Sequence, residues 1–286
     1  MRIAVIADIH GNLDALEAVV ADTADAAPAL VVNLGDCLSG PLAARATADR
    51  LLALGWETVR GNHDRRLVEQ DPAAMGLSDR AAHDQLEASH RAWLAALPAT
   101  LRVDGELPLC HGTPSDDETH LTETVHPTGP APATAGELEA RLGGIMATVV
   151  LCGHSHRPQL MRLPSGQIIL NPGSVGLQAY ADETPVPHVM ATGSPHARYA
   201  LMERGRDGWS FIFRAVEYDW DGAAALARRN GRTDWAEALA TGWIRGGWTA
   251  AWRPRLPPRR LQHRLGAGDH VDLVDADGDQ AVAESG

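Results

Sequence analysis

Residues 3–12 read IAVIADIHGN, an apolar run that ends in an acid, an imidazole, a glycine and an amide. Residues 3–7 are apolar and largely β-branched, and they have the length of a buried strand. After them, Leu16, Val19 and Val20 recur at helical spacing between acidic residues, which predicts an amphipathic helix. This stretch therefore predicts a buried strand, a polar turn and a helix in direct succession.

The same pattern continues after that helix. A predicted strand over residues 29–34 ends at Asp36, a helix over residues 41–54 follows, and a strand over residues 57–60 runs into Asn62. Strands separated by helices form a parallel sheet with helices on its faces. Ligands bind such sheets at the carboxyl ends of the strands, which is where the polar residues fall.

The rest of the chain predicts an α/β protein with two irregular insertions. Further helices are expected over residues 79–97, 137–142, 220–229 and 233–244, and further strands over residues 101–103, 107–110, 148–152 and 168–170. Residues 199–202 and 209–215 flank a glycine-containing turn and predict a hairpin. The insertions, residues 113–132 and 180–195, are expected to be surface loops that influence substrate choice.

Charge and composition exclude several classes of protein. The 286 residues include 37 Asp and Glu but 25 Lys and Arg, all of the latter Arg, so the formal net charge is −12. Proteins that bind nucleic-acid backbones use a basic footprint, which this balance disfavours. No run approaches the roughly 18 apolar residues of a membrane span. The odd count of three cysteines indicates a reducing, cytoplasmic setting. The oligomeric state stays open.

We expect one domain over residues 1–250, because the composition changes twice after it. Residues 251–265 form a basic, proline-containing segment that reads as a linker. Residues 266–286 are acidic and poor in aromatic side chains, which is typical of a disordered tail.

Residues that can bind a metal ion gather at the predicted strand ends. They are Asp8, His10, Asp36, Asn62, His63, His111, His154 and His156. Oxygen and imidazole ligands in this mixture suit a borderline divalent ion such as Mn, Fe, Co, Ni or Zn. Asp8 and His10 are two residues apart, as are His154 and His156, so each pair can converge on one ion.

The order of these residues resembles the calcineurin-like metallophosphoesterase superfamily, and in particular its compact bacterial phosphodiesterase branch. The matching blocks are DIHGN at residues 8–12, GD at 35–36, GNHD at 61–64, HG at 111–112 and GHSH at 153–156. The resemblance implies a metallophosphoesterase domain with a four-layer α/β-β/α sandwich, in which two mixed β-sheets are flanked by helices. It also implies a site for two divalent metal ions, with manganese favoured.

Carried over position by position, the resemblance assigns every ligand. Asp8, His10 and His156 would hold one ion, Asn62, His111 and His154 the other, and Asp36 would bridge the two. Such a pair of ions lowers the pKa of a shared water and neutralises phosphate oxygens. The implied reaction is hydrolysis of a small-molecule phosphate ester by in-line attack of a metal-bridging hydroxide.

Four further residues are candidates for contacts with substrate. His63 lies next to Asn62 and is expected to protonate the leaving oxygen or stabilise its charge. Asn12 and Arg60 are expected either to support the metal ligands from behind or to contact the phosphate. His120 follows His111 in the chain and could overhang the site.

The sequence departs from two branches of the resembled family. Protein phosphatases and dinucleoside tetraphosphatases carry an Asp-Arg-Gly element three residues after the bridging aspartate. Here Ser39 and Gly40 stand where those branches have Asp and Arg, and Asp64 stands where they have Glu. This favours a phosphodiesterase. A phosphomonoesterase, an enzyme like the protein Ser/Thr phosphatases and a non-catalytic scaffold of the same fold remain alternatives.

One aromatic pattern allows two interpretations. Trp235, Leu239 and Trp243 are spaced four apart on one face of a predicted helix. Core packing or a subunit interface is the favoured interpretation, and stacking on a nucleobase is the alternative.

Overall fold

The computed structural model describes residues 1–206 and 208–244. The predicted domain end at residue 250, the linker over residues 251–265 and the tail over residues 266–286 lie outside the described residues. Among the described helices, none is both long and apolar enough to cross a membrane.

The first of two five-stranded sheets is parallel in one half and antiparallel in the other. Its order is β14 (Gly208–Val216), β13 (Ala197–Gly205), β1 (Arg2–Ile6), β2 (Leu30–Asn33) and β3 (Glu57–Thr58). Strands β1, β2 and β3 are parallel, as the alternation of strands and helices predicts. The predicted hairpin of β13 and β14 joins β1 in antiparallel register, with Ala4 opposite Leu201.

The second sheet has a parallel centre and antiparallel edges. Its order is β4 (Thr100–Val103), β5 (Leu107–Cys110), β8 (Val149–Leu151), β10 (Ile168–Asn171) and β9 (Gln159–Arg162). Strands β5, β8 and β10 are parallel, and β4 and β9 pair with them in the opposite direction. The edge strand β9 has no counterpart among the predicted elements.

The strand alternation of β1 decides how the layers stack. Ile3 and Val5 point into a core that also contains Leu109 and Leu151 of the second sheet, so the two sheets pack face to face. Ala4 and Ile6 point the other way, into a separate core beneath the helices. One strand is thus buried on both faces, which explains its unbroken apolar run.

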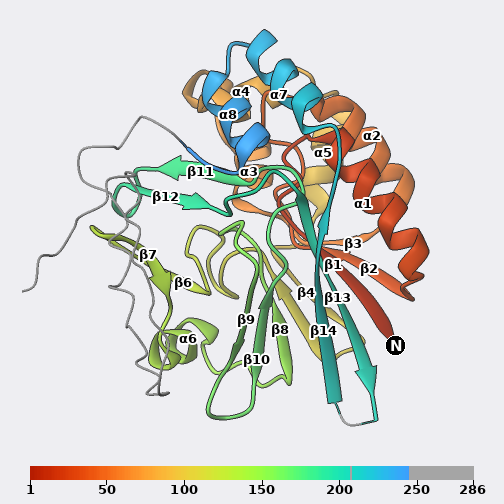
Figure 1. Ribbon diagram of the computed structural model, residues 1–286, viewed down its shortest axis with the longest axis vertical. Helices are drawn as coiled ribbons and strands as arrows, with labels where there is room; N and C mark the ends of the chain where they lie inside the picture. The colour runs from red at the N-terminus through yellow and green to blue at the C-terminus, as the bar shows by residue number, and fades with distance from the viewer. Residues whose placement is uncertain (207, 245–286) are drawn as a thin grey trace, which may run out of the picture. The chain divides into compact units, whose positions relative to one another are not determined.

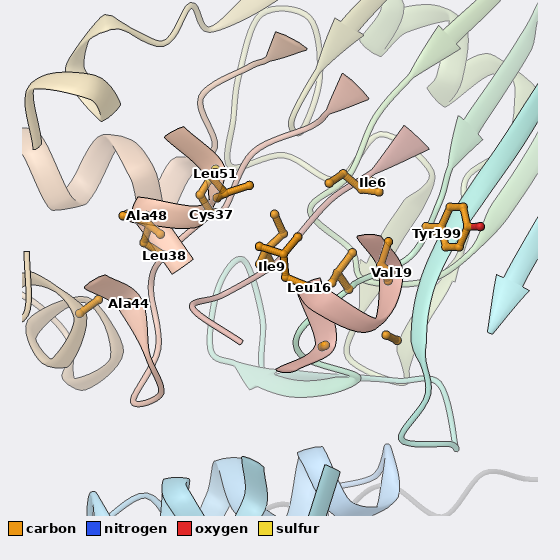
Figure 2. Close-up of a cluster of buried hydrophobic side chains, with 14 of the residues drawn as sticks. Ile6, Ile9, Leu16, Val19, Cys37, Leu38, Ala44, Ala48, Leu51 and Tyr199 are labelled. Carbon is orange, nitrogen blue, oxygen red and sulfur yellow. The ribbon is translucent and has the colours of Figure 1, made fainter. Parts of the chain in front are cut away.

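Helices cover the outer face of each sheet (Figure 1). Those packed on the first sheet are α1 (Leu13–Ala26), α2 (Ala44–Leu54), α3 (Asn62–Glu69), α4 (Leu77–His83) and α5 (Ala88–Ala96). Figure 2 shows Leu16 and Val19 of α1 beside Ile6 and Tyr199. Helix α6 (Ala135–Leu142) packs on the outer face of the second sheet through Leu138. This mixed α/β architecture of two helix-flanked sheets is the one that the resemblance implies.

Both insertions predicted as loops contain hairpins, so that prediction is wrong. Strands β6 (Glu123–His126) and β7 (Gly129–Pro132) pair in one, and β11 (Ala179–Asp182) and β12 (His188–Ala191) pair in the other. Proline is tolerated in β7 because a two-stranded ribbon leaves one side of each strand unpaired. The Pro and Gly residues of the first insertion therefore lie within a strand as well as in the turns around it.

Three predicted helices differ from the structure by three residues or more at one end or by a break. The helix predicted over residues 79–97 is broken into α4 and α5, with a turn over residues 84–87. Helix α2 begins at Ala44, three residues later than predicted. Helices α7 (Trp220–Arg229) and α8 (Thr233–Thr241) follow the sheets, and α8 ends early because Gly242 adopts a left-handed conformation with φ of 70°.

Helix α1 is tied to the first sheet by a buried phenol and an ion pair. The Tyr199 hydroxyl donates to Oδ2 of Asp22, and the Arg214 guanidinium donates to both oxygens of the same carboxylate at 3.0 and 2.6 Å. The hydrogen bond from Arg214 is the main reason that the pKa of Asp22 lies below its usual range.

We therefore expect Asp22→Asn to lower the free energy of unfolding by about 1–2 kcal/mol at pH 7. Because the pKa of Asp22 is lower in the folded state, its contribution is present above the unfolded pKa of about 4 and is lost as the pH falls below it. Urea unfolding of both proteins at pH 7 and pH 3 measures this. Asp25→Asn, an exposed position on the same helix, is the control. An equal loss at both pH values would contradict the prediction.

Candidate functional site

The predicted ligands lie in the loops that follow the parallel strands. Asp8 and His10 follow β1, Asp36 follows β2, Asn62 follows β3, His111 follows β5, and His154 and His156 follow β8. Because parallel strands end at the same edge, both sheets direct these loops to one place. Backbone hydrogen bonds join neighbouring loops there, including those from Asp8 N to Gly35 O at 2.9 Å and from His10 N to Asp36 O at 3.0 Å.

The structure brings the ligand atoms into two groups. In each group, one atom from each of three side chains lies within 4.8 Å of the others. The groups are Asp8, His10 and His156, and Asp36, His111 and His154. Asn62 joins the second group, with Oδ1 3.0 Å from His111 Nε2. Oδ2 of Asp36 lies 3.2 Å from His111 Nε2 and 3.9 Å from His10 Nε2, between the two groups.

The backbone at these residues adopts a conformation that L-amino acids avoid. Left-handed φ values occur at Asp8 (57°), His10 (52°), Asp36 (55°), His154 (70°) and His156 (58°). Each such residue costs on the order of 1–3 kcal/mol and persists only where its surroundings enforce it. The concentration of this strain at the ligand residues marks the loops as a functional site.

The first group consists of lone pairs that face one another. Nδ1 of His10 donates to Ser39 O at 2.8 Å and Nδ1 of His156 donates to Leu177 O at 2.7 Å, because a carbonyl oxygen can only accept. In the neutral rings both Nε2 atoms are therefore without a proton, yet they lie 3.1 Å apart. Oδ1 of Asp8 is buried beside them without a hydrogen-bond partner. A bound cation satisfies all three atoms, so this group fits a metal ion.

The second group has the same character. Nδ1 of His111 donates to a backbone carbonyl, and its Nε2 faces the oxygens of Asp36 and Asn62. Burial alone would lower the pKa of His111, but the charge and hydrogen bond of Asp36, the charge of Asp8 and the Leu34 carbonyl together outweigh it and raise this pKa to about 10. Positive charge is thus strongly favoured at this point. A metal ion bound here would replace the proton.

The imidazoles of His10 and His154 are neutral at pH 7. Burial lowers the pKa of His10 to about 4 and that of His154 to about 4. His154 is held the opposite way from the other rings, because its Nε2 donates to Glu118 O at 2.9 Å and Nδ1 keeps the lone pair. Neutral imidazoles are the form that binds metal ions.

Asp64 holds the loop that carries Asp36. Its buried carboxylate accepts hydrogen bonds from the backbone N–H groups of Asp36, Cys37 and Gly61, at 2.8, 2.9 and 3.0 Å. A Cβ atom on Gly61 would lie 2.2 Å from Asp36 Oδ1, so only glycine fits there. The departure from Glu noted in the sequence thus falls on a residue that orients the central carboxylate.

His63 has a carboxylate partner that the sequence analysis missed. Nδ1 of His63 lies 2.7 Å from Oδ1 of Asp79, a residue of α4 that is 4% exposed. Although burial lowers it, the pKa of His63 is raised by the charge of Asp36 and by the Asp79 contact. Asp79 lies inside a predicted helix with no motif around it. Only the fold of α4 against α3 brings it to His63.

A pocket of about 270 Å³ opens over both ligand groups. His63, Arg66 and Arg232 line it, together with apolar residues of β11 and α8. Both arginines already have acidic partners. Arg66 donates to Glu118 at 2.6 Å and Arg232 donates to Asp234 at 2.6 Å.

The three residues predicted to contact substrate lie outside this pocket lining. Asn12 caps α1 through Ala15 N and donates to Gly176 O, so its amide is fully used. Arg60 pairs with Glu69 at the surface. His120 is buried and stacks on His154 with 4.5 Å between ring centroids. The contacts of Asn12, Arg60 and His120 with substrate stay predictions, and the stacking places His120 behind His154.

Comparison with known proteins agrees with this geometry. The family model described as the calcineurin-like phosphoesterase superfamily domain matches residues 1–192, so the chain belongs to that superfamily. Membership of this superfamily supports a phosphoester hydrolase, without specifying the reaction.

Two solved structures are similar over most of the chain. A metallophosphoesterase from Sphaerobacter thermophilus has 26% identity and a TM-score of 0.66, over 85% of this chain and 100% of that one. A hypothetical protein from Pyrococcus horikoshii OT3 shares the fold at 18% identity and a TM-score of 0.67, over 85% and 99% of the two chains. Among proteins with curated functions, none matches this chain.

We expect Asp79→Asn to lower kcat for phosphate ester hydrolysis by about tenfold to a hundredfold, because His63 loses its orienting carboxylate. The contact with Asp79 raises the pKa of His63, so the limb of the pH–rate profile that reports loss of the His63 proton should move to lower pH. Steady-state profiles of kcat measure both effects. Asp84→Asn, at the exposed end of α4, is the control. A lower kcat with an unmoved limb would assign Asp79 a merely structural role.

Proposed function

We propose that the protein is a dinuclear-metal-dependent phosphodiesterase that hydrolyses a small-molecule phosphate ester. The observation that carries the proposal is the pair of ligand groups joined by Asp36, in which buried lone pairs face one another. Asp8, His10 and His156 would hold one ion and Asn62, His111 and His154 the other. The mixture of carboxylate, amide and imidazole ligands supports Mn, Fe, Co, Ni or Zn, with manganese favoured.

Two bound divalent ions would supply a nucleophile from water near neutral pH and neutralise the phosphate oxygens. The protein's own residues would do the remaining work. His63 lines the pocket with Nδ1 fixed by Asp79, so its Nε2 is the atom that donates a proton to the leaving oxygen. The carboxylate of Asp79 stabilises the charged ring before that transfer.

The charges around the pocket favour a diester over a monoester. A phosphate monoester carries close to two negative charges at pH 7 and a diester carries one. Arg66 and Arg232 are the arginines of the pocket lining, and each is already paired with a carboxylate. The second charge of a monoester therefore has no unpaired guanidinium among the lining residues. A monoesterase or a protein Ser/Thr phosphatase-like enzyme is the alternative, and a non-catalytic scaffold is disfavoured because the ligand set is complete.

The cytoplasmic location and the class of substrate are part of the same proposal. The three cysteines are buried and free, which is compatible with a reducing cytoplasm. The formal net charge of −12 favours a small-molecule substrate over a nucleic acid.

Steady-state hydrolysis of bis(4-nitrophenyl) phosphate and of 4-nitrophenyl phosphate tests the reaction class directly. We expect kcat/KM to be at least about tenfold higher for the diester with Mn²⁺, and activity to be lost after chelation, because the metal supplies the nucleophile. Activity should return when Mn²⁺ is restored. A preference for the monoester would overturn the diesterase proposal in favour of the monoesterase.

Asp36→Asn tests the two-ion site. An amide cannot place a charged oxygen against both groups, so we expect bound metal to fall below two ions per chain and turnover to fall by about 10³-fold or more. Elemental analysis after gel filtration measures the metal, and circular dichroism confirms folding. Full activity in this variant would refute the mechanism.

A further inference from the structure

The pocket over the metal ligands continues into an apolar slot. One wall consists of β11 and the residues before it. The other consists of α8 and Ile244. Side chains from both walls belong to one hydrophobic cluster. Figure 1 shows β11 beneath α8. The apolar residues that line the slot are Leu177, Ala179, Tyr180, Ala181, Trp235, Ala238 and Ile244.

The slot is open because its walls carry small side chains. Ala179 and Ala238 are each 1% exposed and lie on opposite walls, and Ala181 is at the exposed end of β11. Larger side chains at these positions would fill the space between the walls. The open volume of the slot thus depends on these three alanine residues.

The slot begins at the metal ligands themselves. The ring of Trp235 meets His10 edge to face, with centroids 5.9 Å apart, and the ring of Tyr180 meets His156 at 4.7 Å. Both aromatic rings are held in place. The Arg232 guanidinium lies 5.7 Å from the Trp235 ring, and the Tyr180 hydroxyl contacts His120 at 3.0 Å. A phosphate on the metal ligands would therefore have a rigid apolar wall beside it.

We propose that this slot binds the ester group that stays on phosphorus, and that this group is a flat, apolar ring. The inference rests on the proposed phosphodiesterase function. His63 on α3 and the slot of β11 and α8 line one pocket from different elements, so a leaving oxygen beside His63 leaves the slot to the other ester group. A charged group is disfavoured there because Arg232, at the mouth, is already paired with Asp234. In this proposal Trp235 is both a core residue and a wall for a flat ring, which are the two interpretations that its sequence pattern allowed.

The experiment compares two diesters with the same leaving group. Bis(4-nitrophenyl) phosphate and methyl 4-nitrophenyl phosphate both release nitrophenolate, and they differ only in the group that stays on phosphorus. We expect Ala181→Leu to lower kcat/KM for the first by about tenfold, mainly through KM, because a buried apolar contact of this size is worth about 1–2 kcal/mol. The methyl diester should change less than about twofold, since a methyl group does not reach the slot wall.

Two further variants complete the design. Ala238→Leu fills the slot from the opposite wall and should give the same selectivity, with its melting temperature measured because this position is buried. Glu183→Leu places the same side chain on the same hairpin, outside the pocket lining, and should change neither substrate.

The outcomes separate this inference from the proposed function. If the unmodified protein with Mn²⁺ hydrolyses neither diester, the phosphodiesterase proposal fails and the slot proposal fails with it. If it hydrolyses both and Ala181→Leu leaves their ratio unchanged, only the slot proposal is overturned. Equal losses on both substrates also overturn it, because the slot would then contact a part that the two diesters share.

Discussion

The interaction on which the rest of the structure depends is the close approach of buried lone pairs that face one another. Nε2 of His10 and Nε2 of His156 lie 3.1 Å apart without a proton to share, and Oδ1 of Asp8 is buried without a partner. Such an arrangement is unfavourable unless a cation occupies it. The left-handed backbone at the ligand residues adds to the cost. Both costs imply that the scaffold is rigid enough to hold the ligands in place.

That rigidity comes from the central position of β1. Its side chains alternate between the core shared by the two sheets and the core beneath the helices, so no residue of the strand can move without disturbing one of them. The loop after β1 is joined to the loop after β2 by backbone hydrogen bonds, and Asp64 joins the latter to the start of α3. Hydrogen bonds among the loop after β1, the loop after β2 and the start of α3 therefore hold Asp8 and Asp36 in their strained backbone conformation.

The sequence predicted the parts of the site that depend on local order. A ligand directly after a buried strand lies at the carboxyl edge wherever that strand sits in the sheet, so Asp8, Asp36 and His111 could be assigned without knowing the topology. The contacts of Asp79 and Trp235 with the site could not be predicted, because they depend on tertiary packing: α4 packs against α3, and α8 packs against the loop after β1. The hairpins within the insertions were missed for a related reason. Strands of four residues carry too little periodicity to be told from loops, and Pro and Gly within β7 and in the turns add to the likeness.

The residues proposed to carry out the reaction and those proposed to select the substrate also lie in different parts of the sequence. The superfamily match ends at residue 192, and every predicted metal ligand lies within it. Helix α8 lies beyond it, yet its Trp235 contacts His10, and a Cβ atom on Gly40 would lie 2.8 Å from the Trp235 ring. Gly40 is one of the positions where the sequence departs from the phosphatase branches, so the absence of a side chain there is what lets the indole approach the metal ligands. In this protein a helix outside the matched region thus packs where a side chain at residue 40 would lie.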